Sequence, residues 1–230
     1  MKFSNAGTVM IIGGSSGMGF TTAKALLERG LKVEILANNA EKLDKAVSEL
    51  SLLGQVTGTQ INLYDIDAVQ ALASKITSSS THYGYLVNAA GYFSPLAFVE
   101  HTLADYNQYH DLNKATFLLT QAVVKNMEKA GSGSIVNIGS MWAKQAIKAT
   151  PSSAYSMAKS GLHAFTQHLA MELADDIDTT LNSFNAFHPI GRVGEPNDIA
   201  NSIVFLLSDD ASWITGSIVD VDGGVMAGRN

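Results

Sequence analysis

The chain has 230 residues, of which 46% are hydrophobic and 16% are charged, a balance that allows one sizeable buried core and excludes intrinsic disorder. Its 15 lysines and arginines and 21 aspartates and glutamates give a net charge of −6. Because an acidic surface repels phosphate groups, we expect neither nucleic acid nor an anionic membrane as the main partner. Cysteine is absent, which excludes disulfides, a thiolate nucleophile and cysteine-based metal sites.

The N-terminal region carries no recognisable targeting segment. Its apolar run, Val9 to Ile12, ends at two glycines and is too short for the core of a signal peptide. No stretch approaches the roughly 20 apolar residues that a membrane span requires. A cytoplasmic protein is therefore expected.

Short apolar runs rich in β-branched residues alternate with segments of helical period along the chain. Strands are predicted over residues 8–12, 32–37, 55–61, 84–88 and 134–139. Helices are predicted from the first glycines to Arg29 and Gly30, from Asn39 to about Leu50, and from Asp65 onward. This alternation implies βαβ units, so the predicted fold is α/β: one Rossmann-type domain over residues 1–230, a doubly wound parallel sheet with helices on both faces.

A glycine-rich segment, Gly13 to Gly19, joins the first predicted strand to the first helix, where a backbone can approach a bound anion closely. It almost fits the P-loop spacing, but Phe20 occupies the position of the required lysine. It also matches the G-x-S-x-G elbow of hydrolases, with Ser15 as nucleophile, although only 12 residues precede it. The spacing G-x-x-x-G-x-G instead predicts a pyrophosphate site in a Rossmann unit, with a simple tight turn as the alternative.

Tyr155 and Lys159 are one helical turn apart, which places a phenol and an ammonium on the same face of a predicted helix. Apolar residues at helical spacing, from Ala158 and Leu162 to Leu173, predict that this helix has a buried face. A phenol ionises only weakly at neutral pH, and a neighbouring cation favours its ionised form. The pair is a candidate acid–base site, and a solvated helix pair without a role is the alternative.

Several motifs in a fixed order resemble the short-chain dehydrogenase/reductase family. They cover residues 13–19, 86–91, 111–113, 134–140, 155–159, 191–196, 214–216 and 221–224. Ile12 and Ala89 depart from the family pattern, which usually has threonine and a second asparagine at these positions. The resemblance implies an oxidoreductase that transfers a hydride between a nicotinamide cofactor and a carbonyl or secondary alcohol. A non-catalytic dinucleotide-binding sensor or scaffold of the same fold is the alternative.

The resemblance also implies roles for individual residues. Tyr155 would be the general acid or base, Lys159 would hold the nicotinamide ribose, and Ser140 would hydrogen-bond the substrate oxygen. Asn113 would hold a water in the proton path. The implied cofactor-binding residues are Gly13, Ser15, Ser16, Gly17, Met18, Gly19, Asn38, Asn39, Asn62, Leu63, Asn88, Ala89, Ala90, Gly91, Tyr155 and Lys159. Because family members are commonly tetramers, a homo-oligomer, either a dimer or a tetramer, is expected.

The end of the second predicted strand bears on the choice of cofactor. An NAD site usually has a carboxylate about 20 residues after the glycines, bonded to the ribose 2′-hydroxyl. Here that region reads Asn38-Asn39, whose amides can donate to a 2′-phosphate, and Lys42 is a further possible helper. No arginine is present to grip the phosphate. The sequence therefore favours NADP(H) over NAD(H) weakly.

The ends of the fourth and fifth predicted strands carry apolar and aromatic residues. The residues concerned are Tyr92, Phe93, Met141 and Trp142. They lie where open α/β sheets bind ligands, so we expect them to line an apolar substrate pocket, with core packing as the alternative. The 6 histidines show no spacing typical of a metal site, so no metal is expected. The substrate itself cannot be read from these residues.

One stretch of the family pattern has no counterpart in the chain near Asp175 and Asp176. The family has roughly 25 more residues there, including a parallel strand whose loss would leave buried backbone groups unpaired. We therefore predict that residues of the natural protein are missing at this point. A sheet rebuilt around the gap is the alternative.

Overall fold

The protein is described here from a computed structural model. The described residues are 3, 7–146, 148–173, 189–192, 194, 196, 198, 205, 211, 214, 219 and 221–224. The chain divides into two compact units, Met1–Met171 and Glu172–Asn230, and the sheet and the cavities discussed below lie in the first. The gap expected near Asp175 lies outside the described residues, and the single domain over residues 1–230 stays a prediction.

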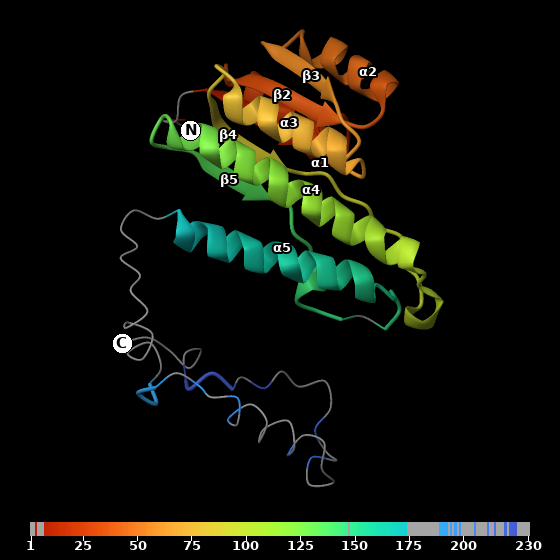
Figure 1. Cartoon of the computed structure of the whole chain (residues 1–230). Coiled ribbons are helices and arrows are strands. Elements are labelled where there is room, and N and C mark those ends of the chain that lie inside the picture. Colours follow the sequence, from red (N-terminus) through yellow and green to blue (C-terminus); the bar gives the residue numbers. More distant parts are fainter. Residues whose placement is uncertain are drawn as a thin grey trace. The chain divides into compact units, whose positions relative to one another are not determined.

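Five parallel strands form one sheet, which confirms the predicted α/β fold (Figure 1). They are β1 (Thr8–Ile12), β2 (Lys32–Ala37), β3 (Val56–Gln60), β4 (Tyr83–Asn88) and β5 (Ser134–Asn137), in the spatial order β3-β2-β1-β4-β5. β1 lies between β2 and β4, so that Ile12 pairs with both Leu36 and Asn88. The strand order reverses on the two sides of β1, and open α/β sheets bind ligands at the carboxyl edge of such a switch point.

Helices cover both faces of the sheet. They are α1 (Gly17–Leu27), α2 (Ala40–Leu50), α3 (Ile66–Ser78), α4 (Leu103–Glu128) and α5 (Ser153–Glu172), with short 3-10 helices at Phe98–Glu100 and Met141–Ala143. Alternate residues of β1 serve two cores: Met10 packs with residues of α3 and α4, and Ile11 packs with residues of α1 and α2. Both helical layers therefore rest on side chains of the same central strand.

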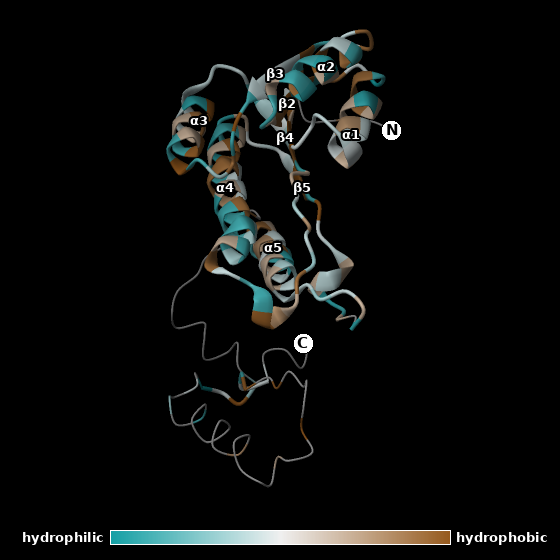
Figure 2. Ribbon diagram, turned by 90° about the vertical axis from the view of Figure 1, so that its right-hand side faces the viewer, coloured by the Kyte–Doolittle hydropathy of each residue, from teal (hydrophilic) through white to brown (hydrophobic). Residues whose placement is uncertain are grey.

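The helix starts follow from local capping. Asn39 accepts a hydrogen bond from the backbone N–H of Lys42 (2.8 Å) at the start of α2, and Asp65 accepts one from Ala68 (3.0 Å) at the start of α3, as the sequence predicted. The long helix α4 begins with a capping box, in which Thr102 and Asp105 each accept from the other's backbone N–H. Figure 2 shows hydrophilic and hydrophobic residues distributed around α2 and α4, as expected for helices with one buried face.

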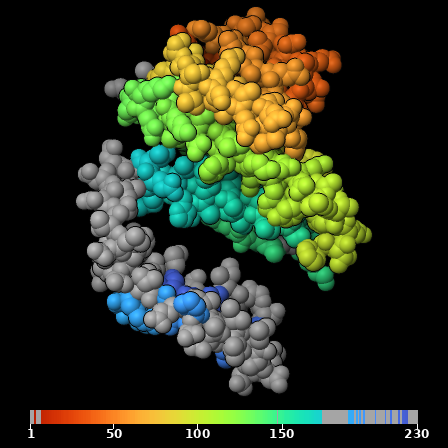
Figure 3. Space-filling view, viewed as in Figure 1, coloured from red at the N-terminus to blue at the C-terminus, as the bar shows by residue number. Residues whose placement is uncertain are grey.

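Helix α5 packs along α4, as both the ribbon and the space-filling view show (Figures 1 and 3). Ala154 and Ala158 of α5 are buried against Tyr109 of α4. The predicted apolar stripe is buried at Ala158 and Leu162 but not at Leu173, which is 46% exposed. Among the described residues, none of the helices combines the length and apolar character needed to cross a bilayer.

Candidate active site

A cavity of about 550 Å³ lies at the carboxyl edge of the sheet. Every strand contributes the residues that follow its last position, and α5 contributes Tyr155 and Lys159. The lining segments are residues 12–13 and 15–18 after β1, 36–38 at the end of β2, 61–64 after β3, 89–93 after β4 and 138–139 after β5, with Leu112 from α4. The cavity therefore occupies the switch point of the sheet, where the strand order predicts a ligand.

The glycine loop after β1 is packed too closely for side chains. Gly13 has φ +87°, and a Cβ there would lie 2.5 Å from the backbone nitrogen of Ala90 in the loop after β4. A Cβ on Gly19 would collide with the carbonyl oxygen of Gly13. The N–H groups of Gly13 and Gly14 both donate to the carbonyl of Leu36, at 2.8 and 3.1 Å, which ties the loop to β2.

The start of α1 is suited to an anion. Its N-cap, Ser16, makes no side-chain capping bond, and its first turn contains no acidic residue. The N–H groups of a first helical turn have no acceptors within the helix, and the helix dipole is positive at this end. Together with the close approach that Gly13 allows, this arrangement fits the pyrophosphate of a dinucleotide.

The ends of β2 and β3 form the side of the cavity where the adenosine half would lie. Asn38 lines the cavity, and its carbonyl accepts from Nε2 of Gln60 at 3.1 Å. Asn39 is not among the described lining residues, because its side chain caps α2. Asn62 and Leu63 line the cavity, and Asn62 Oδ1 accepts from the backbone N–H of Tyr64 at 3.1 Å. Tyr64 was not predicted; partial burial raises the pKa of its phenol.

Tyr155 and Lys159 meet in this cavity, as their spacing predicted. Lys159 Nζ donates to the carbonyl oxygen of Ile138 at 2.8 Å and lies 5.9 Å from the centre of the Tyr155 ring. Burial lowers the pKa of Lys159. The Tyr155 ring is held edge-on between Phe93 and Tyr109, at centroid distances of 4.8 and 5.7 Å. The phenol is thus fixed by its ring, and its hydroxyl is left available for a ligand.

The residues after β5 include three predicted site residues, Ser140, Met141 and Trp142. Ser140 Oγ accepts from the backbone N–H of Trp142 at 3.3 Å and caps the 3-10 helix Met141–Ala143. Ser140, Met141 and Trp142 are not among the described residues that line the large cavity, whereas Tyr92 is. The backbone N–H of Ser140 donates to Nε2 of His163 at 3.5 Å. Met141 lies in this short helix and is 55% exposed.

Asn113 and Asn88 belong to a second, much smaller cavity of about 20 Å³, which also has Tyr155 and Lys159 in its lining. Asn113 Nδ2 donates to the carbonyl of Ala158 at 2.7 Å and so joins α4 to α5 behind the reactive pair. Asn88 Nδ2 donates to Thr120 Oγ1 (3.0 Å) and Asn137 Oδ1 (2.7 Å), while its own buried Oδ1 has no partner among the described residues. Neither asparagine lines the large cavity, and Gly19 does not line it either.

The described lining also contains residues that the sequence prediction did not name as site residues: Ile12, Leu36, Ala37, Ile61, Tyr64, Leu112, Ile138 and Gly139. Most of them are adjacent to a predicted residue; Leu112, for example, precedes Asn113, and Tyr64 follows Leu63. Neighbours of motif residues at strand ends were therefore the signal that could have found them. Among the described residues, no cluster of three or more metal-ligating side chains is present.

The strand order, the uncapped glycine-rich start of α1 and the paired phenol and ammonium define a Rossmann-type dinucleotide-binding protein. The family model described as "short chain dehydrogenase" matches residues 7–183, and a model described as "Enoyl-(Acyl carrier protein) reductase" matches residues 174–226. The chain belongs to the short-chain dehydrogenase/reductase family and is an oxidoreductase. Family membership excludes the hydrolase interpretation of Ser15.

Individual relatives extend over almost the whole chain. A 3alpha-hydroxysteroid dehydrogenase of Mediterraneibacter gnavus is 32% identical over 239 residues, which cover 93% of this chain and 94% of that protein. A 3-oxoacyl-[acyl-carrier-protein] reductase of Synechocystis sp. is 33% identical, covering 98% and 99%. The structure of a short-chain type dehydrogenase/reductase from Mycobacterium ulcerans has a TM-score of 0.66 at 28% identity, covering 98% and 91%.

A first prediction concerns the buried lysine. Because burial lowers the pKa of Lys159, the folded chain binds fewer protons than the unfolded chain between that lowered pKa and the ordinary lysine value of 10.5. This lysine therefore makes the free energy of unfolding rise with pH across that window. Lys159→Met removes the charge, so we expect its melting temperature relative to the wild type to be highest near neutral pH and to fall as the pH rises. Thermal unfolding at several pH values measures this, and a constant difference would contradict it.

Proposed function

We propose that the protein interconverts a carbonyl compound and a secondary alcohol with NADP(H) as the preferred cofactor. The observation that carries the proposal is that Tyr155 and Lys159 line the same cavity as the glycine loop. A group held by the loop therefore shares its space with a phenol and an ammonium. The two relatives described above are named for a hydroxysteroid and a 3-oxoacyl substrate, which supports carbonyl and alcohol chemistry.

The residues that would hold the cofactor follow from the cavity lining. The first turn of α1, with Ser16 to Met18, would bind the pyrophosphate, Asn62 and Leu63 would contact the adenine, and Lys159 would hold the nicotinamide ribose. When bound, the reduced nicotinamide supplies the hydride. Ala89 to Gly91 would form the wall beside it.

In ketone reduction, Tyr155 would donate the phenolic proton to the carbonyl oxygen as the alcohol forms. Lys159 Nζ, which donates to the carbonyl of Ile138, would carry its positive charge 5.9 Å from the centre of the Tyr155 ring. In alcohol oxidation the phenolate would take the proton from the hydroxyl group. Proton transfer thus occurs at one atom, Tyr155 Oη, in both directions.

Ser140 and Asn113 are the two remaining residues of the proposed catalytic site. The Ser140 hydroxyl accepts from Trp142, so its own proton remains free to donate to the substrate oxygen. Asn113 holds the backbone of Ala158 and lines the small cavity behind Tyr155 and Lys159, which supports its role in a proton path. For Ser140, this role requires that its hydroxyl reach the ligand when one is bound.

The preference for NADP(H) rests on the end of β2. Asn38 lines the cavity there, and the described lining contains no aspartate or glutamate that would repel a 2′-phosphate. The test is to titrate NADPH and NADH against the protein by cofactor fluorescence, and then to follow nicotinamide absorbance with a panel of ketones and secondary alcohols. Tighter binding of NADH, or binding of neither cofactor, would overturn the cofactor proposal; absence of turnover with every substrate would overturn the activity.

Asn38→Asp provides a second prediction. A carboxylate at this position would repel a 2′-phosphate and accept from a free 2′-hydroxyl, so we expect NADPH affinity to fall by about tenfold or more, which corresponds to about 1.4 kcal/mol. NADH affinity is expected to stay the same or to rise. Dissociation constants of both cofactors for both proteins measure this, and Asn38→Ala serves as the control that removes the amide without adding charge.

The dimeric or tetrameric assembly and the cytoplasmic location expected from the sequence are kept as parts of this proposal. The relationship to the family supports the assembly. Light scattering of the purified protein would measure its mass in solution, and a monomer at micromolar concentration would contradict the expectation.

A further inference from the structure

A tyrosine outside the reactive pair holds the loop that follows β4. Tyr109 lies on α4, is only 4% exposed, and uses its hydroxyl twice on the same residue. The hydroxyl donates to the carbonyl oxygen of Ser94 at 2.9 Å and accepts from the backbone N–H of Ser94 at 3.1 Å. Two bonds to both polar groups of one residue fix the position and the direction of the chain there.

Among the described residues, the loop held in this way makes few other hydrogen bonds. Residues 91–95 are exposed and belong to neither a helix nor a strand. Farther along, the backbone N–H of Leu96 donates to the carbonyl of Pro151 at 3.1 Å, just before α5 begins. In the stretch between β4 and Leu96, Tyr109 holds the backbone at Ser94. Burial raises the pKa of the Tyr109 phenol, so the proton that it donates to Ser94 is retained at neutral pH.

The residue next to Ser94 reaches the reactive phenol. The ring of Phe93 lies edge-on to Tyr155 at a centroid distance of 4.8 Å and lines the large cavity. Tyr109 itself contacts Tyr155 at 5.7 Å and Tyr92 at 5.5 Å. One buried side chain therefore connects the loop backbone, the cavity wall and the reactive phenol.

The wall made in this way is aromatic. Phe93 is 47% exposed, so much of its ring is available to a ligand, and Tyr92 beside it is 37% exposed. Lys159 is the one lysine, arginine, aspartate or glutamate among the described lining residues. A substrate carbonyl must pass these rings to reach Tyr155. A flat apolar group beside that carbonyl would bind favourably here, because aromatic faces and edges pack well on such groups.

We propose that Tyr109 is a positioning residue that, by clamping Ser94, sets Phe93 against Tyr155, and that the substrates are carbonyl compounds with a flat apolar group beside the carbonyl. This inference rests on the proposed carbonyl–alcohol activity and names its substrate class. The Tyr109 ring packs against the rings of Tyr155 and Tyr92, but its hydroxyl bonds Ser94 and takes no part in the proton transfer. Its effect is exerted through Phe93.

The test compares Tyr109→Phe, Phe93→Ala and the double variant with the wild type, using acetophenone and acetone as probes. Tyr109→Phe removes one oxygen atom and keeps the ring packed, so the fold and NADPH affinity should be unchanged. We expect its kcat/KM for acetophenone to fall by about tenfold, mainly through KM, which is the size of effect seen when one apolar contact in a pocket is lost. The value for acetone should change much less, because acetone lacks the group that Phe93 contacts.

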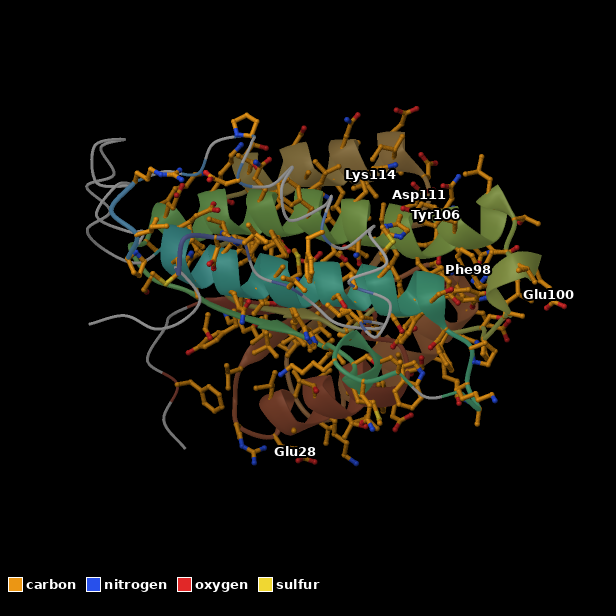
Figure 4. All side chains as sticks on the ribbon, turned by 90° about the horizontal axis from the view of Figure 1, so that it is seen from below. Glu28, Phe98, Glu100, Tyr106, Asp111 and Lys114 are labelled. Carbon is orange, nitrogen blue, oxygen red and sulfur yellow. The ribbon has the colours of Figure 1, made fainter. Side chains whose placement is uncertain are left out.

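The double variant separates positioning from general destabilisation. If Tyr109 acts through Phe93, adding Tyr109→Phe to Phe93→Ala should cause no further loss of activity on acetophenone. Tyr106→Phe is the matched control. Tyr106, which Figure 4 labels, is a tyrosine of the same helix, and its ring stacks on His110 instead. We expect this control to stay within about twofold of the wild type on both ketones.

Each outcome decides one part of the inference. Wild-type values of kcat/KM that are equal for the two ketones, or higher for acetone, would overturn the substrate class. Unchanged kinetics in Tyr109→Phe, or full additivity with Phe93→Ala, would overturn the clamp, and this can be measured on any carbonyl compound that the enzyme reduces. Absence of turnover by the wild type on every carbonyl compound tested would instead contradict the proposed function itself.

Discussion

Tyr155→Phe is expected to lower kcat by about three orders of magnitude, because it removes the group that transfers the proton. The ring contacts with Phe93 and Tyr109 do not involve the hydroxyl, so the variant should pack as the wild type does. Among the described residues, no hydrogen bond to the Tyr155 hydroxyl is found, and its removal therefore leaves no buried partner unsatisfied. We expect the melting temperature and the NADPH dissociation constant to be nearly unchanged.

Steady-state turnover, thermal unfolding and NADPH fluorescence titration together measure this result. Tyr106→Phe makes the same chemical change on an exposed part of α4 and should retain wild-type turnover. Turnover of Tyr155→Phe within a few-fold of the wild type would remove Tyr155 from its assigned role. A large fall in melting temperature would instead show that the hydroxyl contributes to the fold.

The positions of the strands along the chain could be predicted to within two residues because their residues carry the signal locally. Thr8 to Ile12 is an apolar run with β-branched residues on both faces, as a central parallel strand requires. Asn39 and Asp65 mark helix starts because the capping oxygen is three residues from the N–H group that it accepts from. Such contacts depend on neighbours in sequence, which a pattern along the chain contains.

The glycine loop and the Tyr155–Lys159 pair could be predicted for the same reason. The loop needs small residues at fixed spacing, and the pair needs only one helical turn to bring its side chains together. The glycine loop and the Tyr155–Lys159 pair line one cavity. This depends on the parallel sheet, because the carboxyl ends of its strands lie at the same edge. The motifs and the predicted fold together therefore located the site.

Side-chain contacts between distant elements could not be predicted. The bond between Tyr109 and Ser94 depends on how α4 crosses the loop after β4, which no local spacing encodes. The placement of Ser140 is similar. Its position after β5 was predicted, but the 3-10 helix that it caps directs its oxygen to the backbone of Trp142. The aromatic wall of the cavity is therefore a property of tertiary packing, whereas the glycine loop is largely a property of local sequence.

Gly13→Ala is expected to raise the NADPH dissociation constant by about a hundredfold and to lower the melting temperature, because two costs coincide at this residue. A φ of +87° is strained for a residue with a side chain, by about 1–2 kcal/mol. The new methyl group would also lie 2.5 Å from the nitrogen and 2.7 Å from the Cα of Ala90. Overpacking of this kind costs about 1–3 kcal/mol and is relieved here only by moving backbone. The two loops that would separate, after β1 and after β4, both line the cavity.

Gly30→Ala is the control that separates strain from collision. Gly30 has φ +80°, but nothing lies within 4 Å of the position of its Cβ, and it is not part of the cavity lining. It should therefore lose stability through backbone strain while keeping wild-type affinity for NADPH. Fluorescence titration and thermal unfolding of both variants give the comparison. Equal loss of affinity in the two would mean that strain alone weakens binding, and wild-type affinity in Gly13→Ala would mean that contact between these two loops does not shape the cofactor site.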